Sequence, residues 1–142
     1  MLREATCTCG QLTVRVQGDP RIVLACSCLK CQRRTGSVFG VSAYFANEQV
    51  AEIIGDSKTF NPATDSGRPS QRHFCPECGS AVYWIAGAFP GHTGIAVGAF
   101  ADPEFPAPMV SVWNQSKHGW VEFPEHWPSS DTQDIDPALA AS

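Results

Sequence analysis

The stretch Cys26-Ser27-Cys28-Leu29-Lys30-Cys31 places three thiols within six residues, and the rest of the sequence can be interpreted around it. The spacing C-x-C-x-x-C can direct three thiolates toward one metal ion and leave a fourth coordination position open. An open position is typical of catalytic zinc, whereas structural zinc is closed by four protein ligands. The stretch therefore predicts a reactive zinc site on Cys26, Cys28 and Cys31.

The other four cysteines form two pairs, Cys7-x-Cys9-Gly10 and Cys75-Pro76-Glu77-Cys78-Gly79. Two residues between Cys75 and Cys78 let both sulfurs face one ion, and the following glycine permits a tight turn. Together the pairs predict a closed four-sulfur zinc site that cross-links distant parts of the chain and stabilises the fold. The seven cysteines thus divide into four structural ligands and three reactive ones.

Other interpretations of the cysteines remain open at the level of sequence. Iron–sulfur clusters use the same thiols, and spacing does not separate them from zinc. Oxidation could also form a disulfide within the three-cysteine group. His73, two residues before Cys75, is a disfavoured alternative ligand because four thiols already complete that site.

Composition narrows the class of protein. A chain of 142 residues suits one domain with a buried core. It has no run of 18 apolar residues, and the start lacks the apolar segment of a signal peptide, so we expect a cytoplasmic, reducing environment and no membrane partner. Cysteines there act as ligands or reactive thiols. A net charge of −4 argues against a nucleic-acid partner.

Hydrophobic periodicity predicts a mainly β fold of short strands. Leu12, Val14 and Val16 alternate with polar residues, as in a half-buried strand. Further strands are predicted at residues 21–25, 38–45, 81–85, 94–99 and 109–113. A helical turn closed by Gly36 is expected after the three cysteines, residues 47–55 fit a short helix or a bend into a strand, and residues 61–70 read as a loop. We expect one domain over residues 1–127 and a disordered tail over residues 128–142.

Four motifs together resemble one family. They are Cys7-Thr-Cys9-Gly10, Cys26-Ser-Cys28-x-x-Cys31-x-Arg33-Arg34-Thr35-Gly36, Phe74-Cys75-x-x-Cys78-Gly79 and Trp113-x-x-x-Lys117-His118-x-Trp120. In this order they are similar to the glutathione-dependent formaldehyde-activating enzymes, the GFA family, which also includes centromere protein V. The similarity runs from about Ala5 to Trp127.

The resemblance implies a fold, cofactors and an activity. The fold is a zinc-stabilised β-tent of small coiled sheets. A structural zinc is implied on Cys7, Cys9, Cys75 and Cys78, and a catalytic zinc on Cys26, Cys28 and Cys31. The implied activity is that of a carbon–sulfur lyase, which joins formaldehyde to glutathione as S-hydroxymethylglutathione. Many family members have His where this chain has Ser27, so a proton transfer made by that imidazole would be weakened or altered here.

Cations beside the three cysteines suggest how such a substrate is held. Glutathione carries two carboxylates, and Arg33 and Arg34 follow the cluster directly. Because guanidinium groups bind carboxylates in a bidentate manner, both arginines are candidate substrate-binding residues. His118 is a further candidate for the lining of a pocket.

Three functions are compatible with these residues. The first is a zinc-dependent carbon–sulfur lyase that acts on a glutathione–aldehyde adduct. The second is a non-catalytic zinc module that binds glutathione or a protein segment. The third is a thiol redox switch, in which the cluster alternates between metal-bound and oxidised states.

Overall fold

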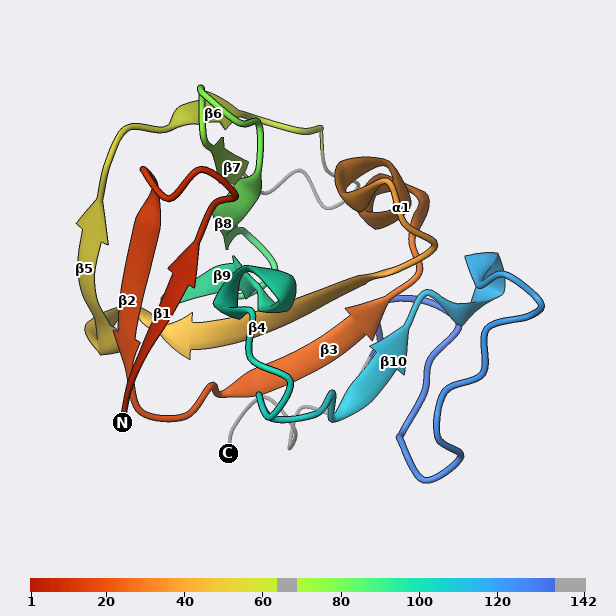
Figure 1. The fold of residues 1–142 in the computed structure, drawn as a ribbon. Helices are drawn as coiled ribbons and strands as arrows, with labels where there is room; N and C mark the ends of the chain where they lie inside the picture. The colour runs from red at the N-terminus through yellow and green to blue at the C-terminus, as the bar shows by residue number, and fades with distance from the viewer. Residues whose placement is uncertain (64–68, 135–142) are drawn as a thin grey trace. The chain divides into compact units, whose positions relative to one another are not determined.

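The structure, a computed structural model, describes residues 1–63 and 69–134 and forms two compact units. Unit 1 contains Met1–Pro20 and Tyr44–Phe105, and unit 2 contains Arg21–Ala43 and the chain from Pro106 onward. Short strands dominate both units (Figure 1). The prediction of a mainly β protein with small sheets is confirmed.

The first sheet of unit 1 has three antiparallel strands in the order β1-β2-β5 (Figure 1). The strands are β1 (Leu2–Thr6), β2 (Thr13–Gln17) and β5 (Val50–Ile54). Val14 and Val16 are fully buried on one face. On the other face Arg15 pairs with Glu4 at 2.9 Å and with Glu52 at 3.0 Å, its register partners on the two neighbouring strands. The alternation predicted for this segment is confirmed, whereas β1 was not predicted.

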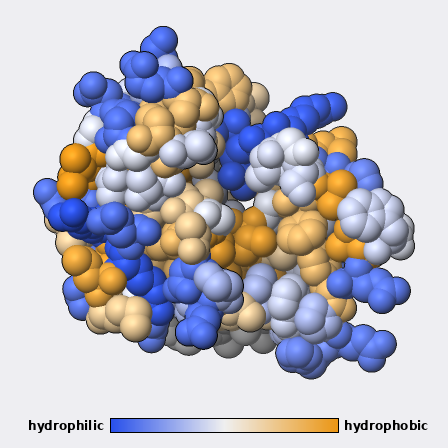
Figure 2. All heavy atoms as spheres, in the orientation of Figure 1, coloured by the Kyte–Doolittle hydropathy of each residue, from blue (hydrophilic) through white to orange (hydrophobic). Residues whose placement is uncertain are grey.

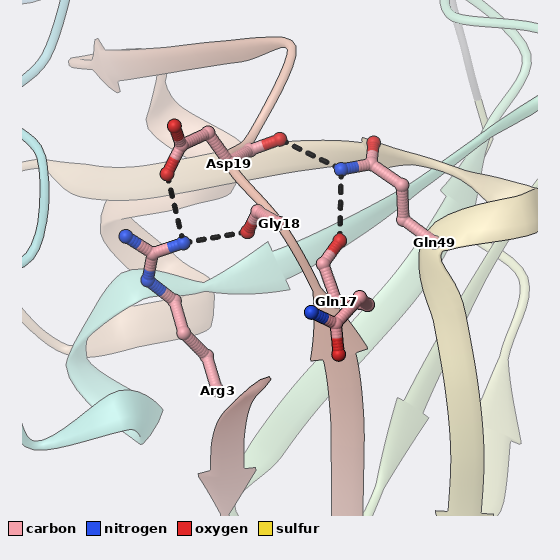
Figure 3. A network of polar contacts seen from close by, with 5 residues as sticks. All are labelled: Arg3, Gln17, Gly18, Asp19 and Gln49. Atoms are coloured by element: carbon pink, nitrogen blue, oxygen red, sulfur yellow. Dashed lines mark hydrogen bonds and ion pairs between the residues drawn. The ribbon is translucent and has the colours of Figure 1, made fainter. Parts of the chain in front are cut away.

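A polar network fixes the turn that follows β2 (Figure 3). Arg3 Nη1 donates hydrogen bonds to the carbonyl oxygen of Gly18 at 2.5 Å and to Asp19 Oδ1 at 3.1 Å. Gln49 Nε2 donates to the carbonyl oxygens of Gln17 at 3.1 Å and Asp19 at 2.7 Å. The turn is therefore held both by β1 and by the segment that precedes β5.

The remaining strands of unit 1 pair in the order β9-β8-β7-β6. They are β6 (Lys58–Phe60), β7 (Ser70–Phe74), β8 (Ala81–Ala86) and β9 (His92–Ala96). The connection between β7 and β8 carries Cys75 and Cys78. The strand predicted at residues 94–99 is partly wrong, because the chain turns into a 3-10 helix, Val97–Phe100, after β9.

Unit 2 is built on two parallel strands, β3 (Ile22–Cys26) and β10 (Val110–Val112), which lie side by side in Figure 1. Every residue of β3 is buried, so its apolar run has no polar face. Helix α1 (Leu29–Thr35) follows, and Gly36 ends it with a left-handed φ of 69°. The predicted helical turn is confirmed. Strand β4 (Gly40–Ala46) begins in unit 2 and ends in unit 1.

Residues 47–55 and residues 128–134 are less regular. The segment 47–55 contains both suggested forms, a 3-10 helix (Asn47–Gln49) followed by β5. In the predicted tail, Pro128 accepts a hydrogen bond from the Ser111 amide at 3.0 Å, and the Ser130 amide donates to Ser111 at 2.9 Å. Residues 64–68 of the predicted loop and residues 135–142 of the tail lie outside the described residues. The domain limit at residue 127 stays a prediction.

The surface in view is mixed in character. Figure 2 shows hydrophobic and hydrophilic residues interspersed over this face. Within residues 1–63 and 69–134, no helix combines the length and the apolar composition needed to cross a membrane.

Candidate metal centres

Unit 1 brings the four predicted structural cysteines together. The sulfur atoms of Cys7, Cys9, Cys75 and Cys78 all lie within 4.8 Å of one another. Cys9 Sγ is 3.6 Å from both Cys7 Sγ and Cys75 Sγ. Tetrahedral zinc, with Zn–S near 2.3 Å, sets its sulfur ligands about 3.8 Å apart. The four sulfurs can therefore hold one metal ion, and their convergence on one point favours a single ion over a cluster of several irons.

Two glycine-ended turns aim these sulfurs inward. The Gly10 amide donates to the Cys7 carbonyl at 3.0 Å, and the Gly79 amide donates to the Cys75 carbonyl at 2.8 Å. Both glycines have positive φ, which side chains disfavour. The Leu12 amide also donates to Cys7 Sγ at 3.3 Å. A backbone amide thus donates directly to one of the four sulfurs.

Gln11 supports this site and was missed by the sequence analysis. Its Nε2 donates to Cys75 Sγ at 3.0 Å and to the Asp56 carbonyl at 2.7 Å, and its Oε1 accepts from the Asp56 amide at 3.0 Å. The only sequence signal was its place next to Gly10. One amide side chain thus joins a cysteine of the site to the turn between β5 and β6.

Ser80 is a second supporting residue that sequence reasoning missed. Its hydroxyl lies 3.4 Å from Cys78 Sγ and 3.0 Å from the Thr8 hydroxyl. This hydroxyl is the largest cause that lowers the pKa of Cys78 to about 5, followed by the backbone amides of Ser80 and Cys9. These hydrogen bonds therefore favour the thiolate form of Cys78.

His73 is engaged away from the four sulfurs. Its ring stacks on Tyr83 with centroids 4.3 Å apart. Nδ1 hydrogen bonds with Ser57 Oγ and Nε2 with Gln71 Oε1, each at 2.9 Å. Burial lowers the pKa of the imidazole. These partners occupy both ring nitrogens, so the alternative of His73 as a ligand has no geometric support.

Unit 2 brings the other three cysteines together. Cys26 ends β3, Cys28 caps α1 and Cys31 lies in its first turn, and their sulfurs lie within 4.8 Å of one another. Cys28 Sγ accepts a hydrogen bond from the Cys31 amide at 3.3 Å. Within the described part of the chain, no further His, Cys, Asp or Glu joins this group. The cluster can therefore hold a metal with three sulfurs and leave one position open.

The thiols of this cluster share their protons unequally. Hydrogen bonds from the thiols of Cys26 and Cys31, helped by the backbone amides of Cys31 and Lys30, lower the pKa of Cys28 to about 2. Hydrogen bonds with the thiols of Cys28 and Cys31, together with burial, raise the pKa of Cys26. The hydrogen bonds from its neighbours therefore favour the thiolate form at Cys28 over that at Cys26.

Residues on both sides of the cluster hold the Ser27 peptide. The Ser27 carbonyl accepts hydrogen bonds from Gln32 Nε2 at 2.9 Å and Ser116 Oγ at 2.8 Å. Gln32 Oε1 lies 3.1 Å from His118 Nε2. His118 is thereby linked to α1 through Gln32. The Ser27 side chain itself is fully buried, and its hydroxyl has no hydrogen-bond partner among the described residues.

The two candidate substrate arginines lie differently on α1. Arg33 is exposed, whereas Arg34 is half-buried. The Cys26 thiol and, less strongly, the charge of Arg34 act to lower the pKa of Cys31, but the hydrogen bond with Cys28 and burial outweigh them and raise it. The charge of Arg34 thus acts on the Cys31 thiol.

Unit 2 also contains a cavity of about 400 Å³. Ser111, Asn114, Lys117 and Trp127 contribute to its lining. Lys117 Nζ donates to the Val121 carbonyl at 2.6 Å at its edge. None of the three cysteines, nor His118, is among the described residues that line it. The motif is therefore split, with Lys117 at the cavity and His118 at α1.

The fold and the two sulfur clusters define a mainly β protein with one closed and one open candidate metal site. The model of the glutathione-dependent formaldehyde-activating enzyme family matches residues 2–116, and this chain belongs to that family. The match includes all seven cysteines.

Two individual proteins are similar to the chain. One is a Fusarium vanettenii protein, provisionally named as a glutathione-dependent formaldehyde-activating enzyme, with 30% identity over 77 residues. That match covers 54% of this chain and 40% of the relative, so the chain spans less than half of that protein's length. The other is a Rhodobacter sphaeroides protein of known crystal structure, with a TM-score of 0.51 and 20% identity. It covers 68% of this chain and 85% of its own, and it supports the fold.

Proposed function

We propose that this protein is a zinc-dependent carbon–sulfur lyase that joins formaldehyde, or a related aldehyde, to the thiol of glutathione. The observation that carries the proposal is the open cluster of Cys26, Cys28 and Cys31, whose three sulfurs converge within 4.8 Å. Membership of the family supplies the substrate class.

In this proposal the two clusters have different roles. Cys7, Cys9, Cys75 and Cys78 hold a structural zinc, and Cys26, Cys28 and Cys31 hold a more labile catalytic one. Zinc at the open cluster would lower the pKa of a thiol ligand and polarise a carbonyl oxygen. The hydrogen bonds to Cys28 keep one ligand in its thiolate form before metal arrives.

Arg33 or Arg34 is the proposed partner of a substrate carboxylate. Two cations within the last turn of α1 suit an anionic tripeptide. Formaldehyde is a strong electrophile, so holding the thiol in place supplies more of the rate than acid–base catalysis. The buried Ser27 hydroxyl has no described partner through which to relay a proton. A preference for other aldehydes, or slower turnover, would agree with the absence of a proton relay through Ser27.

Calorimetry on anaerobically purified, zinc-loaded protein tests the proposal. Glutathione should bind, and S-methylglutathione, whose thiol is blocked, should bind roughly ten- to a hundredfold more weakly if a charged contact is lost. Consumption of formaldehyde faster than its uncatalysed reaction with glutathione should require zinc. Equal affinity for the two ligands would refute the thiol–zinc contact, and binding without turnover would instead identify a binding module.

A further inference from the structure

Cys31 and Arg34 share one face of helix α1. Residues three positions apart are neighbours on a helix surface, whereas residues two apart face different directions. Arg34 is therefore placed on the side of Cys31, and Arg33 is not. The half-buried state of Arg34 and the exposure of Arg33 agree with this geometry.

Gly40, the first residue of β4, makes room for the Arg34 guanidinium. A Cβ built at Gly40 would lie 2.6 Å from Arg34 Nη2 and 3.5 Å from Cys31 Cβ. The first distance is far shorter than an ordinary van der Waals contact, which is about 3.5–4.0 Å between carbons. A side chain at position 40 would therefore displace the guanidinium from the side of Cys31.

Space, and not backbone conformation, explains the glycine at position 40. Gly40 does not have a positive φ, unlike Gly36 in the same unit. Alanine could adopt its backbone conformation without the cost that left-handed glycines avoid. Gly40 is buried, so the room beside it is not open solvent.

A fixed cation at this place has a clear electrostatic use. Three thiolates outweigh the charge of one divalent ion, and a thiolate ligand at the open position adds a further negative charge. A guanidinium remains protonated at all physiological pH values, and in a half-buried place its charge is screened less than at the surface.

We infer that Gly40 keeps the guanidinium of Arg34 beside Cys31, where it offsets the negative charge of the three-cysteine cluster and of an anionic thiolate bound there. Arg34 is thus a positioning residue for the thiolate, and Gly40 is the residue that places it. The part of this inference that concerns the bound thiolate rests on the proposed function, whereas the effect on the cluster itself does not.

The test compares Arg34→Gln, Gly40→Ala and the double variant with Lys30→Gln, which removes a cation from an exposed position of the same helix. Zinc affinity of the labile site is measured by competition with a chromogenic chelator. Binding of glutathione and of 2-mercaptoethanol, which has no carboxylate, is measured by calorimetry on zinc-loaded protein. Arg34→Gln and Gly40→Ala should each weaken the binding of zinc and of both thiols roughly tenfold, which is the lower end for a lost charged contact. Lys30→Gln should bind zinc and both thiols nearly as the wild type does.

The double variant and a conservative variant distinguish this role from general damage to the fold. Gly40→Ala should add little to Arg34→Gln, because both changes remove the same contact. Arg34→Lys should recover part of the affinity. Equal behaviour of Arg34→Gln and Lys30→Gln, additive losses in the double variant, or loss for glutathione alone would overturn the inference. Absence of formaldehyde turnover in the wild type, with these differences present, would refute the lyase activity and leave the inference standing.

Discussion

At the scale of single residues, Ser27 shows how a position between two ligands can serve the site through its backbone. Its carbonyl accepts hydrogen bonds from Gln32 and Ser116, while its side chain is fully buried. In this chain the peptide group fixes the loop between Cys26 and Cys28.

Replacing Ser27 by Ala should raise the free energy of unfolding by about 1 kcal/mol, because a buried hydroxyl without a partner is removed. The contacts of the carbonyl are unaffected, so zinc content and turnover should stay near wild type. Chemical denaturation and a turnover assay measure both effects. A large loss of turnover in a stable Ser27→Ala protein would show that the hydroxyl does transfer a proton.

At the scale of elements, Gln11 joins the segment before β2, the turn after β5 and the connection between β7 and β8. The turn approaches closely, since a Cβ at Gly55 would lie 1.8 Å from the Gln11 carbonyl oxygen. Gly55 also has a φ of 98°, so both the space and the backbone conformation require glycine at this position. The four-cysteine site is therefore supported by hydrogen bonds from a neighbouring element as well as by its own turns.

Gln11→Ala should lower the free energy of unfolding by about 0.5–1.5 kcal/mol, because it removes the hydrogen bonds to Cys75 and to the exposed Asp56 backbone. Loss of a residue that orients a metal ligand should also weaken zinc binding at the structural site about 10–100-fold. Thermal unfolding and chelator competition measure these effects. Gln17→Ala, the same change at an exposed position of β2, serves as the control and should alter neither.

At the scale of the molecule, the two clusters differ in what they connect. The contact between Cys9 and Cys75 spans 66 positions and joins two separate segments of unit 1. Cys26, Cys28 and Cys31 lie within one short stretch. Closing a long loop costs chain entropy, so metal at the four-cysteine site stabilises the folded state more than metal at the open cluster.

Cys78→Ser should therefore lower the free energy of unfolding by several kcal/mol, because binding free energy at a structural zinc site is folding free energy. Cys28→Ser should leave a folded protein with about one zinc ion, while the wild type carries about two. Differential scanning calorimetry and elemental analysis of the full chain check both statements. Equal destabilisation by the two substitutions would contradict the division of the cysteines into four and three.

The sequence determined the features that depend on local spacing. Periodicity predicted β2, apolar runs predicted β3 and β8, and Gly36 predicted the end of α1 because a left-handed cap favours glycine. The spacing of the cysteines predicted two groups, and the structure brings the sulfurs of each group together.

Tertiary structure alone decided the features that depend on residues distant in sequence. Arg33 and Arg34 are adjacent in the sequence, and the burial of Arg34 and the approach of Gly40 to it distinguish the two. Gln11 belongs to a candidate metal site because its side-chain amide donates to Cys75 Sγ. Ser27 is buried because the rest of its unit packs around it. Close approach and burial are set by how distant segments pack, whereas spacing and periodicity report only on the neighbours along the chain.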